Sequence, residues 1–324
     1  MADVLCAFKD ARSIVVSGHA RPDGDALGSM IALAHLLDRE GFRAVAAGER
    51  TGLGAPGFLR GVERLVPPDT AARRKCDLLV TLDCGDADRL PEPLRKLAQT
   101  CATVNIDHHK TNTRFGTFNW VDAKASSTGE LIWRLARKAG WTLDDIAAEA
   151  LWVAIITDTG RFAYDMTKPA TLRCGADLLC YGVRTSFIND KMYASFSATN
   201  IELKRRAFQS LEIFGNGEIA AVSLTQRDFA ETGGVKADAE DVIDIPRNVA
   251  GNRVALFFYA SEDSPTTTRV SIRTREPLDA TALAEQFGGG GHARAGGCTV
   301  MQPIAQARRT VLKAVAAWMQ EVGR

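Results

Sequence analysis

Short apolar runs alternate with helix-length segments through the first half of the chain, and this alternation restricts the fold more than any other feature. The runs SIVVS (13–17) and DLLVTL (77–82) are too short for buried helices and are bounded by polar residues, so they predict buried strands. The same pattern predicts strands at 43–47 and 103–106, and helices at 25–40, 127–139 and 146–157. Strands that alternate with helices are typical of a parallel sheet flanked by helices.

The pattern of the second half predicts a smaller second α/β domain. The segment 189–212 ends in a charged helical stretch, IELKRRAFQSLE, and is followed by strands at 219–224, 253–260 and 269–274, a glycine-rich turn, GGGGHARAGG (288–297), and a helix at 304–321. A chain of 324 residues also exceeds the usual domain length of about 150. We therefore expect domains at 1–188 and 214–324, joined by a helical linker at 189–213, with the active-site cleft between them.

Composition excludes several classes of protein. The net charge of +1 gives no global attraction to long duplex nucleic acid. The seven cysteines form no C-x-x-C pair, which favours reduced thiols over a disulfide framework or a zinc finger. No apolar run approaches the roughly 20 residues of a membrane span, and the N-terminus lacks the pattern of a signal peptide. We expect a cytoplasmic protein without a membrane partner.

Potential metal ligands follow the ends of several predicted elements. The loop after the first strand, GHARPDGDALGS, carries His19, Asp23 and Asp25, and the next motifs are TLDCGD, NIDHHKTN and ITDTGRF. Ligands of open α/β sheets bind where the carboxyl ends of adjacent strands leave a crevice, so we expect these side chains to converge. The later motifs supply Asp83, Asp107, His108, His109 and Asp158.

This set of donors favours two divalent ions. Imidazoles and carboxylates without thiolates suit Mn²⁺, with Mg²⁺ or Co²⁺ as alternatives, and Asp83 on the central loop is the natural bridge between two ions. Taken alone, Asp25 or Asp158 is more simply interpreted as a helix cap. Four loops that all carry Asp or His at the end of an element are difficult to explain as four separate caps.

These motifs resemble those of a known family. HARPDGDALGS, TLDCGD, IDHHKTN and TDTGRF are similar to the four motifs of the DHH phosphoesterase superfamily. The segment GGGGHARAGG resembles the glycine-rich motif of the DHH-associated domain, which accompanies it in the NrnA-type branch of oligoribonucleases and pAp phosphatases. The resemblance spans nearly the whole chain and implies a DHH catalytic domain followed by a substrate-binding domain.

The resemblance also implies roles for individual residues. Asp107 is implied to support the metal ligands without binding metal itself. His109 is implied to face the scissile phosphate as a charge stabiliser or proton donor. One Mn²⁺ is implied at His19, Asp23 and Asp83, and the other at Asp25, Asp83, His108 and Asp158.

In the second domain, residue chemistry predicts a clamp for a phosphate or nucleotide. Successive glycines let backbone N–H groups approach an anion closely, although a glycine run alone is equally consistent with a flexible surface loop. Arg273 resembles the family position that holds the terminal phosphate of a short substrate, and an Arg fork suits that task. The other members of the predicted clamp are Gly289, Gly290, Gly291, His292 and Arg294.

A helix N-terminus at Ser127 is a further candidate for substrate contact. Ser127 and Glu130 fit a capping box, and the free N–H groups of the same turn favour an anion such as a substrate phosphate.

The expected activity is metal-dependent hydrolysis of short oligoribonucleotides to mononucleotides, together with dephosphorylation of pAp (3′-phosphoadenosine 5′-phosphate) to AMP. A terminal-phosphate clamp at a fixed distance from the metals favours RNAs of about two to five residues. One alternative is a phosphodiesterase for cyclic dinucleotides such as c-di-AMP or for their linear product pApA. The other is a nucleotide-binding regulator without catalysis. The resemblance leaves a homodimer open.

Overall fold

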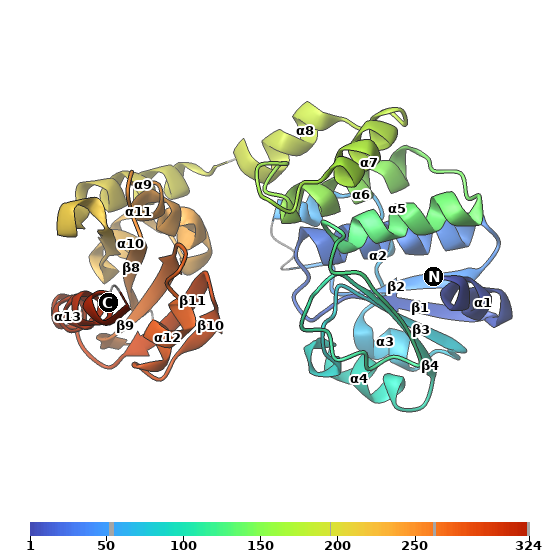
Figure 1. Ribbon diagram of the computed structural model, residues 1–324, viewed down its shortest axis with the longest axis horizontal. Coiled ribbons are helices and arrows are strands. Elements are labelled where there is room, and N and C mark those ends of the chain that lie inside the picture. Colours follow the sequence, from blue (N-terminus) through green and yellow to red (C-terminus); the bar gives the residue numbers. More distant parts are fainter. Residues whose placement is uncertain (52–54, 195, 262–263, 323–324) are drawn as a thin grey trace. The chain divides into compact units, whose positions relative to one another are not determined.

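The computed structural model describes residues 1–51, 55–194, 196–261 and 264–322, and it forms two compact units (Figure 1). The units are Met1–Ser195 and Phe196–Arg324. This division falls inside the segment expected to be a linker, and the expected domain limits at 188 and 214 stay predictions.

The first unit is built on a parallel sheet of five strands, in the order β2-β1-β3-β4-β5. The sequence predicted four of these strands, at 13–17, 43–47, 77–82 and 103–106, and the structure confirms them. The fifth strand was not predicted, because it follows β4 after a loop without a helix. The strands are β1 (Ser13–Ser17), β2 (Arg43–Ala47), β3 (Leu78–Leu82), β4 (Ala102–Asp107) and β5 (Phe118–Val121).

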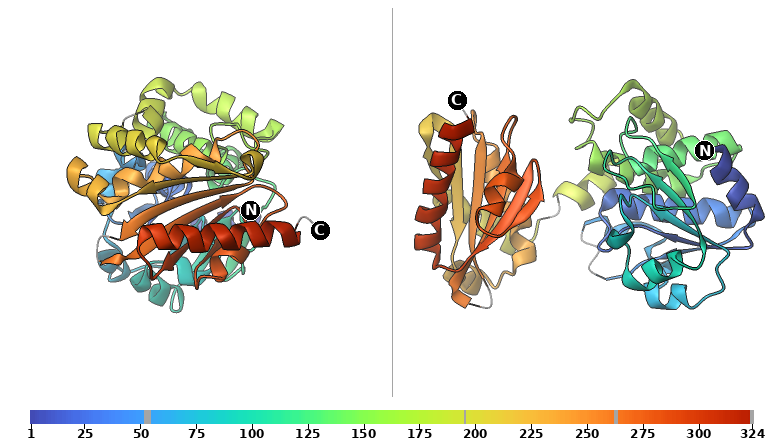
Figure 2. Two further views of the ribbon diagram at one scale, coloured as in Figure 1. Left: turned by 90° about the vertical axis from the view of Figure 1, so that its left-hand side faces the viewer. Right: turned by 60° about the horizontal axis from the view of Figure 1, so that its bottom comes forward.

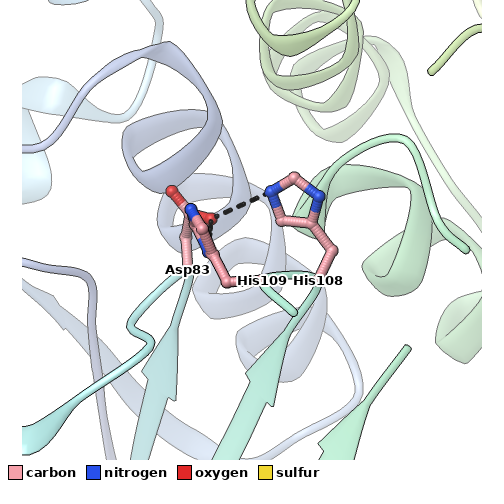
Figure 3. Close-up of side chains that lie close together, drawn as sticks. All are labelled: Asp83, His108 and His109. Atoms are coloured by element: carbon pink, nitrogen blue, oxygen red, sulfur yellow. Dashed lines mark ion pairs between the residues drawn. The ribbon is translucent and has the colours of Figure 1, made fainter. Parts of the chain in front are cut away.

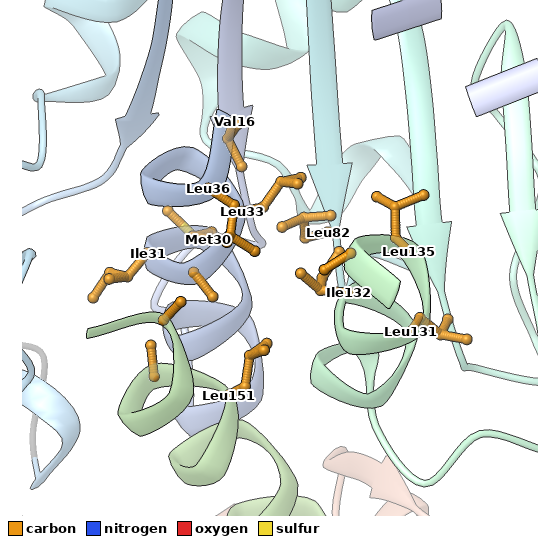
Figure 4. Packing of buried hydrophobic residues seen from close by; sticks show 14 of the residues in the cluster. Val16, Met30, Ile31, Leu33, Leu36, Leu82, Leu131, Ile132, Leu135 and Leu151 are labelled. Atoms are coloured by element: carbon orange, nitrogen blue, oxygen red, sulfur yellow. The ribbon is translucent and has the colours of Figure 1, made fainter. Parts of the chain in front are cut away.

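Both faces of this sheet are covered, as the continuous apolar runs of the strands require. Figure 4 shows the larger core, in which Val16 and Leu82 of the sheet pack with Leu33, Leu36 and Ile132 of the helices. A smaller cluster on the opposite face contains Val15, Leu79 and Leu94. The helices of this unit are α1 (Ala2–Asp10), α2 (Gly24–Arg39), α3 (Pro68–Ala72), α4 (Glu92–Ala98), α5 (Thr128–Ala139), α6 (Asp145–Asp158), α7 (Pro169–Leu179) and α8 (Thr185–Asn189).

The second unit is built on a mixed sheet in the order β10-β11-β9-β8-β7-β6. Figure 2 shows α13 lying along one face of this sheet, where Val311 and Trp318 pack into a core with Leu256 and Ile272. The strands are β6 (Glu212–Phe214), β7 (Ile219–Leu224), β8 (Val254–Ser261), β9 (Ser264–Thr274), β10 (Gly290–His292) and β11 (Ala295–Val300). The helices are α9 (Ala198–Gln209), α10 (Gln226–Thr232), the 3₁₀ helix η6 (Lys236–Ile243), α11 (Asp244–Arg247), α12 (Ala280–Glu285) and α13 (Ile304–Val322).

Within the described residues, no helix is both long and apolar enough to cross a lipid bilayer.

Candidate metal centre

The strand order places the predicted ligands at one point of the first sheet. The chain runs from β1 outward to β2 and then returns to β3 on the other side of β1, so the loops after β1 and β3 diverge and leave a crevice between them. The loop after β1 carries His19 and Asp23, and Asp83 comes directly after β3. Asp83 is almost fully buried and has a left-handed backbone (φ 54°), a costly conformation for a residue other than glycine.

Two imidazoles lie on either side of the Asp83 carboxylate. His19 Nε2 lies 3.7 Å from Asp83 Oδ2 and 3.8 Å from Asp23 Oδ2. His108 Nε2 lies 3.5 Å from Asp83 Oδ1, 3.7 Å from Asp25 Oδ2 and 3.0 Å from Asp158 Oδ2. Figure 3 shows Asp83 with His108 and His109, which reach it from the end of the neighbouring strand. The structure therefore brings all six predicted metal ligands together.

The donor atoms fall into groups that could each hold an ion. One group is His19, Asp23 and Asp83, and another is Asp25, His108 and Asp158, with ligand atoms within 4.8 Å of one another in each group. A third group joins Asp83 and His108 with His109. Asp83 thus contacts both imidazole–carboxylate groups, as a bridging carboxylate must.

The state of the two imidazoles fits a cation. Nδ1 of His19 lies 3.0 Å from the Ala20 carbonyl oxygen, which can only accept, so Nδ1 carries a proton and Nε2 faces the carboxylates of Asp23 and Asp83. Nε2 of His19 and Nε2 of His108 are buried and have no hydrogen-bond partner of suitable geometry in the described part of the chain. Buried polar atoms normally have partners, and a divalent ion between nitrogen and carboxylate would supply one.

The carboxylates of the site also indicate excess negative charge. Burial raises the pKa of Asp25 well above its usual value, and the charges of Asp83 and Asp158 raise it further. Burial lowers the pKa of His108, but contacts with Asp158, Asp83 and Asp25 outweigh burial and raise it to about 11. A bound cation relieves the same repulsion without protons.

The N-terminus of α5 contacts Asp25, one of the predicted metal ligands. Asp25 accepts hydrogen bonds from the backbone N–H groups of Thr128 (2.7 Å) and Gly129 (2.9 Å). Ser127 caps the helix by accepting from Glu130 N, as predicted, but the predicted capping box is not complete, because the Glu130 carboxylate accepts from Ser126 N and Oγ and not from Ser127 N. The sequence predicted that N–H groups of this turn could bind a substrate phosphate. In the structure, two of them bind the Asp25 carboxylate instead.

Two supporting residues were missed from the sequence. The hydroxyl of Thr128 donates to Asp83 Oδ1 (3.1 Å), and Asn112 Nδ2 donates to Asp107 Oδ2 (2.6 Å). Asn112 lies in the quoted motif NIDHHKTN, so its place just after the histidines was the available signal. The signal for Thr128 was weaker, since it only marked the start of a helix.

Asp107 and His109 form a hydrogen-bonded pair beside the predicted metal ligands. His109 Nδ1 lies 2.7 Å from Asp107 Oδ1, and the side chain of His109 is about one-third exposed, at 37%. Asp107 is fully buried and also accepts from the backbone N–H of His108. The hydrogen bond to Asp107 uses Nδ1 of His109 and does not involve Nε2.

The predicted clamp residues lie on or next to two strands of the second sheet. Arg273 is on β9, Gly290, Gly291 and His292 are on β10, Gly289 directly precedes β10, and Arg294 lies in the turn between β10 and β11. Gly289 and Gly291 are required by close packing: a Cβ at Gly289 would lie 2.2 Å from the Gly297 carbonyl oxygen, and a Cβ at Gly291 would lie 2.3 Å from that of Ala295. Arg273 is half-buried on β9. Gly290 has open space around its Cα, and the side chain of His292 lies outside the described part of the structure.

Arg294 has local partners. Its guanidinium donates to the Leu278 carbonyl and to Glu276 Oε1, both at 2.6 Å, which fixes the turn before α12. Three of its five N–H groups are not used by these two bonds.

The sequence matches two family models, one in each unit. Residues 13–155 match the DHH family, N-terminal domain, and residues 219–321 match the DHHA1 domain.

Similarity to individual proteins extends over nearly the full length. The chain is 31% identical to the bifunctional oligoribonuclease and PAP phosphatase NrnA of Thermus thermophilus, over 97% of this chain and 92% of that protein. It is 28% identical to the protein of the same name from Bacillus subtilis, over 89% of each. Its fold is similar to the crystal structure of an exopolyphosphatase-related protein from Bacteroides fragilis, with a TM-score of 0.89, 22% identity and coverage of 100% and 97%.

Proposed function

This chain belongs to the DHH family and carries a DHHA1 domain, and from that membership we propose that it hydrolyses short oligoribonucleotides to mononucleotides and dephosphorylates pAp to AMP. The names of the relatives from Thermus thermophilus and Bacillus subtilis state both activities for those proteins. The observation that carries the proposal is the position of Asp83, whose two carboxylate oxygens face His19 and His108 separately.

We assign the metal ligands from the same geometry. His19, Asp23 and Asp83 would hold one divalent ion, and Asp25, Asp83, His108 and Asp158 would hold the other. Ions bound there supply an activated water and neutralise charge on the phosphoryl group. Mn²⁺ is the proposed metal because the donors are nitrogen and oxygen only. The neighbouring thiol of Cys84 contacts the Asp86 carbonyl oxygen (3.1 Å) and belongs to none of the three donor groups.

Asp107 and His109 act on the substrate without binding metal in this proposal. Asp107 holds Nδ1 of His109, so the ring presents Nε2 to the phosphoryl group. His109 can then donate a hydrogen bond to a phosphoryl oxygen, or a proton to the leaving oxygen. Asp107 is a positioning residue, and the hydrogen bond from Asn112 fixes it in turn.

The second unit would bind the end of the substrate that is not cleaved. Arg273 supplies a guanidinium for the terminal phosphate, and Gly289, Gly290, Gly291, His292 and Arg294 complete the clamp. The two hydrogen bonds that fix Arg294 leave further N–H groups for a phosphate.

A side-by-side initial-rate assay with Mn²⁺ tests the proposed function. The substrates are pAp, pApA, c-di-AMP, 5′-phosphorylated RNAs of two, three and five residues, and a long RNA. We expect rapid turnover of the short RNAs and of pAp, with the long RNA left intact. Selective cleavage of c-di-AMP would replace the proposal with a cyclic-dinucleotide phosphodiesterase. If none of the substrates is turned over, the proposed hydrolase activity is refuted.

A further inference from the structure

Alternate residues of β9 project two arginines from one face of the second sheet. In the pairing of β9 with β8, Arg273, Ser271 and Arg269 lie opposite Ala255, Phe257 and Tyr259. Side chains alternate between faces along a strand, so Val270 and Ile272 point to the other face, where they are buried in the core formed with α12 and α13. Arg269 and Arg273 therefore share a face, four residues apart, with Ser271 between them.

Only half of that face is covered. Leu203 of α9 and Val242 of η6 pack on the part formed by β7 and β8, in a cluster with Val222 and Phe257. The part formed by β9 and β11 is more open, and Arg269 and Thr299 are exposed there.

The uncovered half is nearly flat beside the arginines. The residues of β11 opposite Arg273 and Ser271 are Ala295 and Gly297, whose side chains are a methyl group and a hydrogen atom. A pocket of about 330 Å³ adjoins this surface, and its lining includes Phe257, Tyr259, Ser271 and Arg273. The surface has room for an extended ligand along β9.

The two arginines lack the ion pairs that other arginines of the unit make. Arg206 and Arg308 pair with carboxylates, whereas neither Arg269 nor Arg273 has an ion pair within the described ranges. Arg273 donates to the carbonyl of its neighbour Ile272, and burial lowers the pKa of its guanidinium. The pocket also contains Lys236 and Glu240, whose charges cancel, so the arginines give this face an excess of positive charge.

We propose that Arg269 binds a second phosphate of a single-stranded oligoribonucleotide, two nucleotides beyond the 5′-phosphate held by Arg273. A strand rises about 3.3 Å per residue, so positions four residues apart on β9 lie about 13 Å apart, which is close to two phosphate-to-phosphate steps of an extended single strand. This inference rests on the proposed function and deepens it, because Arg269 makes affinity depend on RNA length. An RNA of three residues reaches both arginines, whereas one of two residues reaches Arg273 alone.

The test is direct binding without metal, so that no RNA is cleaved. Fluorescence anisotropy in EDTA would measure 3′-labelled, 5′-phosphorylated RNAs of two, three and five residues on wild type, Arg269→Gln, Arg269→Lys and Arg309→Gln. Arg309 is a matched control because it is an exposed arginine on α13, on the opposite side of the sheet, and has no ion pair in the described structure.

We expect wild type to bind three residues about tenfold more tightly than two, as one charge-assisted phosphate contact allows. Arg269→Gln should abolish that step without changing binding of two residues, and it should reduce the slope of log affinity against log salt for three residues by about 0.7. Arg269→Lys should keep most of the step, and Arg309→Gln should behave as wild type. Equal weakening for two and three residues, or no weakening, would overturn the inference.

Failure of the inference and failure of the proposed function give different results. If wild type hydrolyses short RNAs with Mn²⁺ but Arg269→Gln keeps the length step, the function stands and the second phosphate site is wrong. The opposite outcome is that wild type binds three residues more tightly than two and loses this difference in Arg269→Gln, yet hydrolyses nothing. In that case the second phosphate site stands and the proposed hydrolase activity is wrong. Thermal unfolding of each variant identifies any loss of binding caused by misfolding.

Discussion

Asp107 Oδ1 lies 2.7 Å from Nδ1 of His109 and, at the same time, 2.8 Å from the backbone N–H of His108. One carboxylate oxygen thus orients both histidines of the DHH motif. Burial favours the neutral carboxyl, but hydrogen bonds from His109 and Asn112 outweigh burial and hold the pKa of Asp107 below its usual value. The hydrogen bond to Asp107 in turn raises the pKa of His109. The pair behaves as an anchored imidazole next to the proposed metal ligands.

Asp107→Asn should slow the reaction without removing the metals. The amide keeps the size of the side chain, but it has only one acceptor oxygen. It can therefore accept from His109 Nδ1 or from Asn112 Nδ2, but its NH₂ group cannot accept from the other. We expect kcat to fall about 10- to 100-fold, the range found when an outer partner of a metal site is lost. Initial rates and metal content, measured on the same preparation, check this. The double variant Asp107→Asn/His109→Gln should be no slower than His109→Gln alone, and additive losses would contradict the positioning role.

Asp83→Asn should remove both metal ions, because its carboxylate faces both imidazoles. Asp158→Asn should remove only one, since Asp158 lies near His108 and not near His19 among the close contacts of the site. Metal content by elemental mass spectrometry after dialysis measures this difference, and activity of Asp83→Asn should fall at least about a hundredfold. The control is Asp88→Asn, which changes an exposed carboxylate outside the site. Equal metal content in the Asp83 and Asp158 variants would argue against a shared ligand.

Glu149 on α6 should contribute stability that is lost in acid. Its buried carboxylate accepts hydrogen bonds from Arg184 Nε (2.5 Å) and Arg60 Nη2 (3.0 Å). Burial alone would raise its pKa, but the two arginines outweigh burial and lower it. The contribution is therefore complete above the unfolded pKa of about 4.3 and disappears as the pH falls through the lower folded value.

Glu149→Gln should destabilise the first unit by about 2 kcal/mol at pH 7, less than for a fully buried pair because both arginines are more than one-third exposed. Urea unfolding of both proteins should show this gap narrowing below about pH 4. Glu92→Gln is the control, since Glu92 forms an exposed pair with Lys96 and should change stability little. A gap that stays constant with pH would contradict the assigned pKa shift.

Cys76 and Cys101 should form a disulfide on mild oxidation. Their Sγ atoms lie 3.5 Å apart at the amino ends of β3 and β4, and contact with Cys76 lowers the pKa of the Cys101 thiol. Glutathione disulfide would accept the two electrons and two protons of the thiols and leave as two glutathiones. Peptide mapping should find Cys76 linked to Cys101. In Cys76→Ser, Cys101 should carry glutathione instead, and linkage of Cys101 to the exposed Cys6 or Cys180 in wild type would contradict the strand geometry.

Much of the fold could be predicted because its signals are local. The run SIVVS marks β1, and IAAVSL marks β7, at the bounds that the structure shows. The predicted helix at 25–40 is shifted by one residue from α2 at both ends, and the predicted helix at 127–139 differs from α5 by one residue at its start. Strand β5 could not be found this way. It is a short, half-buried edge strand that follows β4 without the helix that a parallel connection usually needs, so neither its composition nor its neighbours indicate it.

By itself the sequence indicated which His and Asp side chains to expect at one site, because they follow apolar strands at a regular place. It could not decide which atoms meet. The strand order alone brings the loop after β1 beside the end of β3 and lets Asp83 face both His19 and His108. The tertiary structure also decided that N–H groups of α5 donate hydrogen bonds to Asp25. A buried carboxylate needs such bonds, and its own segment does not supply them. Contacts between residues distant in the chain depend on the packing of whole elements, and no local pattern encodes them.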